Sequence, residues 1–498
     1  MTSPDPAADP VAGVMVPDPA ADLVAGVWRE APAGDGPILE NPATGEPLRP
    51  IAVTPDDRVE AALAQAAAVQ TWAGTPAAER AEVLDAVAVA VEAAAERITT
   101  WEAYATGVPV RQTAILSVIL GGAFRLAAAQ LREGWTATTA VREDGRTVHI
   151  ERLPWGPAVC LVPWNAPAPM AAHKVANALA AGCPAILKPS EYAPYGSQLL
   201  ATAIDEGLRG CGVPAGVFQF VHGAAATGAR LVGDDRVRAV SFTGGLAGGR
   251  AVAAACAAGM KPVQLELGGN NPLIVLPDAD TGAAARAAAD LLTTLNGQWC
   301  RALGRLIVPA DRHDEIVAAV LDRLGGLAVG DPLDPATDFG PLVHSGHRAA
   351  VAAARDRLGG TVLAPVRVPA AGNYLSPALV TGADPAATTE EIFGPVAAVH
   401  AYATVDEAVA LANGTPYGLE AYVLGTDEDA ALAVARRVRA GEVKVNGSSI
   451  MSLHLFTPRP AWGLSGLSEE GTAETLRFFT NARVIGVEGG FALHGRSA

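Results

Sequence analysis

The sequence predicts an α/β protein built around a doubly wound parallel sheet, followed by a second α/β section. From residue 157 onward, short apolar runs alternate with longer alanine-rich runs, which is typical of strands and helices that follow one another. The same alternation continues between about residues 270 and 470. The chain has 498 residues, of which 50% are hydrophobic and 18% charged, so it is globular and long enough for two or more lobes.

The N-terminal segment contains a tandem repeat. Residues Pro4–Val14 read PDPAADPVAGV, and residues Pro17–Val27 read PDPAADLVAGV. A solenoid needs several stacked units, whereas this segment offers two short ones rich in proline, aspartate and alanine. We therefore expect residues 1–27 to be disordered.

Helices are predicted after this repeat. Thr54 and Thr75 each precede a proline, which places a capping hydroxyl before a proline at the first helical position. Long runs of alanine, valine and leucine follow both sites as far as about Ile98. A third apolar segment runs from about residue 113 to 131.

Residues 134–152 predict a β-hairpin. β-Branched and polar residues alternate on both sides of Asp144-Gly145, which is a strong signal for a tight turn. An isolated hairpin of this size is only marginally stable in water. We therefore expect it to pack on another part of the protein or on another subunit.

The alternation places the strands and helices of the two α/β sections. In the first section we expect strands at 158–162, 184–188, 217–221, 238–242 and 262–266, with helices at 170–182, 196–208 and 247–258. In the second section we expect strands at 305–308 and 441–445, with helices at 313–324 and 404–413.

Composition and charge argue against several classes of protein. The 36 lysines and arginines against 52 aspartates and glutamates give a net charge of −16, which disfavours nucleic acid as a partner. We find no run of roughly 18 uninterrupted apolar residues and no secretion signal, so we expect no membrane span. Five cysteines without a CxxC spacing argue against a disulfide framework and favour a reducing, cytoplasmic location.

Motifs for other chemistry are missing from the sequence. His344 and His347 are three residues apart without a third ligand nearby, so we expect a polar pair and no metal site. The chain has neither a G-x-S-x-G elbow nor a G-x-x-x-x-G-K-[ST] loop.

Several short segments carry polar and glycine residues that point to chemistry. They are PWN (163–165), KPSE (188–191), SFTGG (241–245), ELGGN (266–270), NGQWC (296–300), EIFGPV (391–396) and PYGL (416–419). In this order and spacing they resemble the aldehyde dehydrogenase superfamily, over about residues 28 to 485. The resemblance implies a modified Rossmann-type cofactor domain, an α/β catalytic domain and a small β oligomerisation element.

The resemblance also implies domain boundaries and an assembly. Residues 28–133 and 153–266 would form the NAD-binding domain, and residues 267–475 the catalytic domain. Residues 134–152 and 476–498 correspond to the oligomerisation elements of the family, so we expect a homodimer or a homotetramer.

The oxidation of an aldehyde needs a nucleophile, and Cys300 is the natural candidate because a thiolate is the strongest nucleophile available at neutral pH. The polar residues Asn296, Gly297 and Gln298 precede it and indicate a loop. We expect the remaining cysteines to be small buried hydrophobes: Cys160, Cys183, Cys211 and Cys256.

Two more residues complete the predicted catalytic set. Glu266 ends an apolar strand and lies 300 − 266 = 34 residues before the cysteine, which is the spacing of the family. The resemblance makes Glu266 the general base for the water step. Asn165 follows a strand, and its amide would stabilise the oxyanion together with the backbone N–H of Cys300.

The predicted cofactor is NAD, with NADP less favoured. No intact G-x-G-x-x-G opens the first section, and the nearest run begins at Gly223. By resemblance, Lys188 and Glu191 meet the adenosine ribose and Trp164 lies by the pyrophosphate. The turn and helix start beside the dinucleotide would be Phe242, Thr243, Gly244, Gly245 and Gly249. Glu391 and Phe393 would position the nicotinamide ribose and ring.

The residues predicted to line the aldehyde site are Met170, His173, Trp299, Arg301 and Met451. They are mostly apolar, as is the stretch Ile450–Phe456, so we expect a medium-sized aromatic or alkyl aldehyde. Arg301 has two interpretations: a structural salt bridge, or a clamp on the carboxylate of a semialdehyde. Segment 459–471 departs from the family, with glycine where the family has a lysine.

We therefore predict an NAD(P)-dependent enzyme that oxidises an organic aldehyde to its carboxylic acid through a cysteine thiohemiacetal and thioester. A CoA-acylating aldehyde dehydrogenase is one alternative, although it would not need Glu266 as a base. A catalytically silent family member that acts as a binding or structural subunit is the other. The joint presence of Cys300, Glu266 and Asn165 argues against it.

Overall fold

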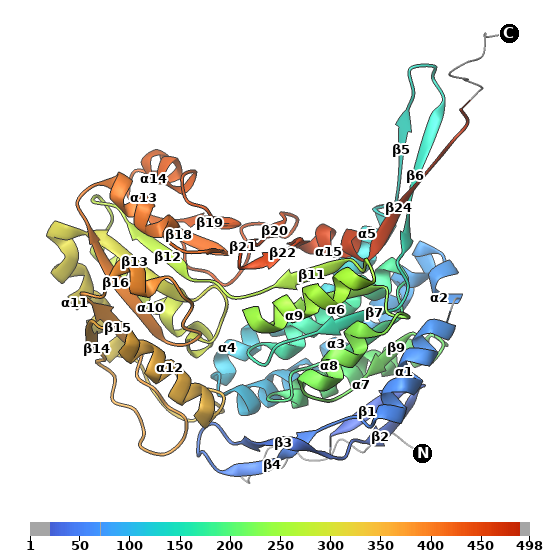
Figure 1. Ribbon diagram of the computed structural model, residues 1–498, viewed down its shortest axis with the longest axis horizontal. Coiled ribbons are helices and arrows are strands. Elements are labelled where there is room, and N and C mark those ends of the chain that lie inside the picture. Colours follow the sequence, from blue (N-terminus) through green and yellow to red (C-terminus); the bar gives the residue numbers. More distant parts are fainter. Residues whose placement is uncertain (1–19, 70, 489–498) are drawn as a thin grey trace.

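Two large sheets flanked by helices form the body of the molecule, and a thin three-stranded arm projects from it (Figure 1). The computed structural model describes residues 20–69 and 71–488. The two α/β sections predicted from the alternation of apolar runs correspond to these two sheets.

The first sheet has eight strands in the order β2-β1-β9-β8-β7-β10-β11-β22. Its central strands run parallel, from β9 to β11. Their bounds confirm the predicted strands: β7 (Ala158–Leu161), β8 (Ala185–Lys188), β9 (Phe218–Phe220), β10 (Ala239–Thr243) and β11 (Val263–Glu266). Ligands of such sheets bind beyond the carboxyl ends of the strands.

Helices pack around this sheet (Figure 1). They are α1 (Asp56–Ala68), α2 (Thr71–Gly74), α3 (Ala77–Thr106), α6 (Pro167–Ala181), α7 (Pro194–Gly210), α8 (Ala225–Gly233) and α9 (Leu246–Ala258). The helices predicted after residues 54 and 75 are present as α1 and α3. The predicted caps are wrong, because Pro55 and Pro76 are themselves the N-cap residues. The hydroxyl of Thr54 donates to buried Asp22 instead, and that of Thr75 to the Thr71 carbonyl.

The expectation of disorder up to residue 27 is wrong for the second copy of the repeat. Ala21–Val24 form β1 and Val27–Glu30 form β2, a tight antiparallel pair. β1 is buried along its length and lies beside β9, with Leu23 opposite Phe220. Its apolar side chains close the edge of the core, and this burial outweighs the effect of a composition rich in proline and aspartate. The first copy lies outside the described residues.

One stretch among the described residues, Val110–Arg132, is long and apolar enough to cross a membrane by length and composition alone. It consists of two helices, α4 (Val110–Ile115) and α5 (Ser117–Arg132), which meet at Leu116. Half of the most apolar part of this stretch is buried inside the protein, and α5 packs against α3 and α6. The stretch therefore contributes to the core of the first lobe.

The second sheet has seven strands in the order β14-β15-β16-β13-β12-β18-β19, and only the β14–β15 pair is antiparallel in this part of the described chain. The strands are β12 (Asn271–Val275), β13 (Leu303–Pro309), β14 (Thr361–Leu363), β15 (Ala378–Thr381), β16 (Val396–Tyr402), β18 (Glu420–Leu424) and β19 (Glu442–Val445). The helices are α10 (Thr281–Thr293), α11 (His313–Gly325), α12 (Ser345–Arg357), α13 (Val405–Asn413) and α14 (Glu428–Ala435). The predicted elements at 305–308, 313–324, 404–413 and 441–445 are all present.

The arm contains the predicted hairpin. Its strands are β5 (Ala137–Val141), β6 (Thr147–Pro154) and β24 (Thr480–Gly486), in the order β24-β6-β5. Gly145 lies in the turn with a φ of 80°, a conformation that glycine adopts without strain. Figure 1 shows the arm extending away from both lobes, and no strand of the described residues lies on the outer side of β5.

The C-terminal segment returns to the first lobe before it enters the arm. It forms β20 (Arg459–Pro460), β21 (Trp462–Gly463), β22 (Gly466–Leu467), β23 (Glu469–Glu470) and α15 (Thr472–Phe478). β22 pairs with β11, and α15 packs on α6. The predicted catalytic domain, 267–475, thus ends in a segment that belongs to the first sheet by its pairing. The remaining strands are short or peripheral: β3 (Ala33–Glu40), β4 (Pro47–Ala52) and β17 (Tyr417–Gly418).

Candidate active site

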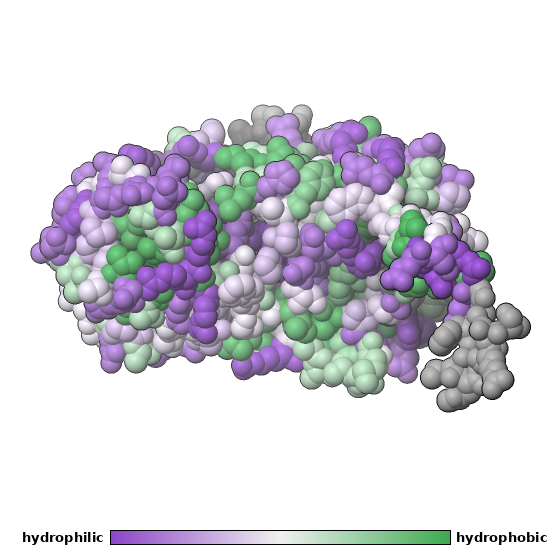
Figure 2. All heavy atoms as spheres, turned by 90° about the horizontal axis from the view of Figure 1, so that it is seen from above, coloured by the Kyte–Doolittle hydropathy of each residue, from purple (hydrophilic) through white to green (hydrophobic). Residues whose placement is uncertain are grey.

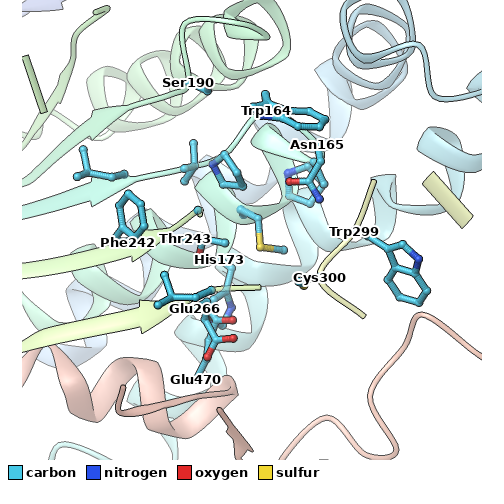
Figure 3. A pocket seen from close by; sticks show the side chains of 18 of the residues that line it. Trp164, Asn165, His173, Ser190, Phe242, Thr243, Glu266, Trp299, Cys300 and Glu470 are labelled. Carbon is cyan, nitrogen blue, oxygen red and sulfur yellow. The ribbon is translucent and has the colours of Figure 1, made fainter. Parts of the chain in front are cut away.

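A cavity of about 1090 Å³ receives side chains from both lobes, and all but two of the predicted site residues line it. The catalytic candidates that line it are Cys300, Glu266 and Asn165. The lining cofactor candidates are Trp164, Lys188, Glu191, Phe242, Thr243, Gly244, Gly245, Glu391 and Phe393. The lining substrate candidates are Met170, His173, Trp299, Arg301 and Met451. Figure 3 shows many of them around one space.

Cys300 follows a strained loop, as the polar residues before it predicted. Leu295 and Asn296 have φ values of 49° and 57°, in the left-handed region that non-glycine residues rarely adopt. The side-chain amide of Asn296 holds this conformation, because it donates to the carbonyls of Gly107 and Pro341 at 2.8 and 2.9 Å. The loop therefore fixes the position of the cysteine from the second lobe.

The thiol of Cys300 is held in its neutral form. Burial raises its pKa to about 12, and the negative charge of Glu266 acts in the same direction, whereas the Arg301 guanidinium opposes the shift. A thiol with such a pKa needs a nearby base to remove its proton when it attacks a carbonyl.

Glu266 ends β11 and is buried at the cavity wall. Its Oε1 atom has no hydrogen-bond partner within the described chain. Burial and the negative charge of Glu470 raise the pKa of Glu266 to about 8. A carboxyl group with this pKa can hold and release a proton near neutral pH, which suits a general base.

Glu470 and Lys174 form a buried ion pair beside Glu266, and the sequence did not identify either residue. The Lys174 ammonium lies 3.3 Å from Glu470 and donates to the Ser241 hydroxyl at 2.7 Å. Although burial acts to raise the pKa of Glu470, the positive charge of Lys174 lowers it below its ordinary value. Their positions are 296 residues apart in the chain, so no local spacing could have paired them.

Asn165 approaches the cavity from the first lobe. It follows β7 and lies just before α6, whose N-terminal residues include Pro167. Figure 3 shows Asn165, Glu266 and Cys300 coming from different elements toward the same hollow. An amide donor that faces the carbon attacked by the thiol can stabilise the oxyanion that forms there.

The cofactor side of the cavity lies at the carboxyl ends of β8 and β10. Lys188 is buried there and donates to the Pro189 carbonyl at 2.9 Å, and burial lowers its pKa to about 8. Gly245 begins α9 without a side-chain cap, so backbone N–H groups of the first turn remain available. The hydroxyl of Thr243 is buried without a hydrogen-bond partner among the described residues.

These features fit a dinucleotide. Anionic phosphates bind well to uncapped helix N-termini, and a Cβ on Gly245 would meet nothing within 4 Å. Glu191 offers a carboxylate that can accept hydrogen bonds from ribose hydroxyls. The residues present are therefore suited to NAD or NADP.

Glu391 and Phe393 reach the cavity from the second lobe. Gly269 N–H donates to Glu391 Oε1 at 2.9 Å, and a side chain at Gly268 would overlap this carboxylate. Phe393 packs edge-to-face on Trp164, with ring centroids 5.4 Å apart. The two glycines after Glu266 therefore make room for Glu391.

Gly223 and Gly249 do not line the cavity, although the sequence placed them beside the cofactor. Gly223 has a φ of 146°, and a Cβ there would overlap Thr227. Gly249 packs closely on Leu267, which itself lines the cavity. Both glycines act through backbone packing.

His347 is a lining residue that the sequence placed in a simple polar pair. Its Nε2 donates to the Phe393 carbonyl at 2.8 Å, and its ring contacts Trp164 at a centroid distance of 5.0 Å. His344 caps α12 by accepting from the His347 backbone N–H. Among the described residues, no group of histidine, cysteine, aspartate and glutamate side chains is arranged to hold a metal.

Arg301 adopts the first of its two predicted interpretations. It is buried and forms ion pairs with Glu420 at 2.6 Å and Glu442 at 2.7 Å. Its Nη1 atom is therefore committed to protein carboxylates. Trp299 also has a structural contact, because its indole N–H donates to the Leu291 carbonyl at 3.3 Å.

The mouth of the cavity is mainly apolar. Its lining side chains come from two segments, α5 with the preceding residue and the loop around residue 451. They are Leu116, Val118, Ile119, Leu126, Ile450, Met451 and Leu455. Several are exposed, as are the adjacent Leu453 and Phe456. Figure 2 shows hydrophobic patches interspersed with hydrophilic ones across one face of the molecule.

Known proteins similar in sequence to this chain are aldehyde dehydrogenases. A sequence model described as the aldehyde dehydrogenase family matches residues 28–485. Geranial dehydrogenase of Castellaniella defragrans is 36% identical over 402 residues, which cover 78% of this chain and 82% of that protein. The non-phosphorylating aspartate-semialdehyde dehydrogenase of Halomonas elongata is 36% identical over 451 residues, covering 86% and 88%.

Solved structures similar to this chain are also aldehyde dehydrogenases. Betaine aldehyde dehydrogenase from Staphylococcus aureus in complex with NAD⁺ has a TM-score of 0.88 at 26% identity, covering 96% of each chain. An aldehyde dehydrogenase variant from Pseudomonas syringae, complexed with NAD⁺ and octanal, has a TM-score of 0.86 at 31% identity, covering 94% of this chain and 97% of that one.

Proposed function

The chain belongs to the aldehyde dehydrogenase family, NAD(P)-dependent enzymes that oxidise aldehydes to carboxylic acids, and from this premise we propose that Cys300, Glu266 and Asn165 perform the reaction. The observation that carries the proposal is their meeting in one cavity, although they come from three separate elements. The proposed roles follow from the chemistry of each group.

Cys300 attacks the aldehyde carbon and forms a thiohemiacetal. Because burial keeps the thiol neutral, its proton passes to solvent water as the S–C bond forms and the aldehyde oxygen becomes an oxyanion. The amide of Asn165 and the backbone N–H of Cys300 donate to the oxygen that becomes negative.

The nicotinamide cofactor, when bound, accepts a hydride. We propose that Lys188 and Glu191 hold the adenosine ribose, that Trp164 and the start of α9 lie by the phosphates, and that Glu391 and Phe393 position the nicotinamide half. The uncapped helix start and the buried Thr243 hydroxyl support this assignment.

Glu266 then activates water to cleave the thioester. Its unpartnered Oε1 atom can accept the proton of a water molecule, and the ion pair of Lys174 with Glu470 keeps a second charge beside it. This step yields the carboxylic acid and restores the free thiol.

The CoA-acylating alternative and the silent-subunit alternative are separated by one experiment. Formation of reduced cofactor is followed at 340 nm with an aldehyde panel, with and without CoA. Turnover without CoA supports the hydrolytic reaction. Turnover that needs CoA supports acyl transfer, and an absence of turnover with every aldehyde supports the silent subunit.

We also propose a substrate of medium size with an aromatic or alkyl body. The apolar mouth formed by α5 and residues 450–455 supports this assignment. Geranial and octanal, the compounds in the names of two relatives, have such bodies. We also propose the domain boundaries expected from the sequence; the two sheets support them, whereas the C-terminal segment pairs with β11 of the first sheet.

We further propose a homodimer or homotetramer in the cytoplasm. The exposed apolar side chains of the arm, such as Val141, Val484 and Ile485, support an interface there. The five cysteines are free thiols, which supports a reducing compartment. Light scattering of the purified chain distinguishes monomer, dimer and tetramer.

A further inference from the structure

Among the described residues, three arginines line the cavity, and they differ in their partners. Arg125 donates two hydrogen bonds of 2.6 Å to the carboxylate of Glu92. Arg301 is paired with Glu420 and Glu442. Arg459 has neither an ion pair nor a side-chain hydrogen bond with any residue that the structure places.

Arg459 lies on β20, directly opposite Glu470 on β23, yet it does not pair with this acid. The carboxylate of Glu470 contacts Lys174 and His173 instead, at 3.3 and 3.9 Å. The Nε atom of Arg459 is buried and has no acceptor within the described chain. The guanidinium thus borders the cavity with its Nε donor unsatisfied.

The charge of Arg459 acts close to the reacting groups. It lowers the pKa of Glu266, of Glu470 and of Cys300, in each case against the larger, opposing effect of burial. A partly buried cation therefore lies close to the nucleophile, without a direct ion pair to any of the described residues.

A buried charged donor without an acceptor is unfavourable, and a carboxylate is the acceptor whose two oxygens match the guanidinium fork. We propose that Arg459 is a specificity-determining residue that binds a carboxylate at the far end of the aldehyde's alkyl or aromatic body. The inference rests on the proposed function of this cavity. The sequence analysis considered such a carboxylate contact for Arg301, and we now assign it to Arg459. The apolar walls then contact the carbon skeleton between the two functional groups.

The test compares 4-oxobutanoate with its methyl ester, in which a methyl group removes the negative charge. For each, kcat/KM is measured with NAD, and the ratio of acid to ester is the readout. This ratio cancels any loss that both substrates share, including an indirect effect of Arg459 on Glu266. We expect the wild type to prefer the acid, and Arg459→Met to lower the ratio about 10- to 100-fold, as expected for a lost charge-assisted hydrogen bond.

Two more variants complete the design. Arg459→Lys keeps the charge but loses the fork, so its ratio should lie between those of the wild type and Arg459→Met. Arg125→Met removes a cavity-lining guanidinium that already has a carboxylate partner, so its ratio should stay near the wild-type value. NAD binding to each variant, followed by fluorescence titration, reports that the protein is folded.

Two results would overturn the inference. One is a wild type that oxidises acid and ester equally well, and the other is an Arg459→Met variant that loses both activities in the same proportion. In either case NADH is still formed, so the proposed function stands. If the wild type formed no NADH from either compound or from any other aldehyde, the proposed function itself would fail.

Discussion

Glu266 and Glu470 are two buried carboxyl groups that line the same cavity but differ in charge, because the Lys174 ammonium lies 3.3 Å from Glu470. Burial and the charge of Glu470 raise the pKa of Glu266 to about 8. We propose Glu266 as the base of the deacylation step, and a base must be deprotonated, so the raised pKa of Glu266 should set the pH dependence of turnover.

We expect kcat to rise with pH and to level off above about pH 8. Glu470→Gln removes the negative neighbour, so the pKa of Glu266 falls and the midpoint of the profile moves to lower pH, by about one unit. Glu469→Gln is the control, because it removes the same charge from an exposed position on the same strand. A midpoint that is the same in all three proteins contradicts the electrostatic coupling.

Cys300→Ala should abolish oxidation, because no thiohemiacetal can form without the thiol. The loop around Asn296 does not depend on the sulfur, so the fold and NAD binding should persist. NADH formation and NAD titration are measured on the same preparation. A variant that kept a tenth of the wild-type rate would show that Cys300 is not the nucleophile.

Glu266→Gln should release one burst of NADH and then turn over about 10²- to 10⁴-fold more slowly, as expected for the loss of a general base. The burst amplitude, measured by stopped flow, should approach the enzyme concentration. If steady-state turnover were unchanged, another group would be the base for the water step.

NAD should be preferred over NADP. The carboxylate of Glu191 borders the cavity near Lys188, where it would accept from a ribose hydroxyl and repel a 2′-phosphate. The measurement is the ratio of kcat/KM for the two cofactors, in the wild type and in Glu191→Gln. The variant should lower this ratio, and a wild-type ratio in favour of NADP would refute the assignment.

Arg301→Met should destabilise the protein by about 3–5 kcal/mol, because it leaves a buried carboxylate with one partner fewer. Urea unfolding followed by fluorescence gives the change in midpoint. The control is Arg437→Met, which breaks an exposed pair with Asp406 and should cost about 1 kcal/mol or less. Equal midpoints for the two variants would contradict the structural role of Arg301.

The elements that the sequence predicted correctly are those that depend on a local pattern of residues. The strands from 158 to 266 and the hairpin at 134–152 are confirmed, because each carries its own alternation and turn signal. The resemblance supplied Cys300, Glu266 and Asn165, and the structure brings them to one cavity.

What the sequence missed depends on partners that are distant along the chain. Lys174 meets Glu470 only after β23 returns to the first lobe, and the partners of Arg301 lie on β18 and β19. Thr54 resembles a helix N-cap in the sequence, but its hydroxyl donates a hydrogen bond to buried Asp22 instead. β1 was missed because its apolar residues stand in a segment dominated by proline and aspartate.

The position of β1 between β2 and β9 has a consequence for the duplicated N-terminal segment. The two copies differ at one position, where Pro10 in the first copy corresponds to Leu23 in the second. Leu23 is buried opposite Phe220, whereas a proline there would have no backbone N–H and a smaller apolar side chain. A shift of the chain by one copy would therefore put an incompatible residue into the sheet. Because of this one difference, the second copy is better suited than the first to the position of β1.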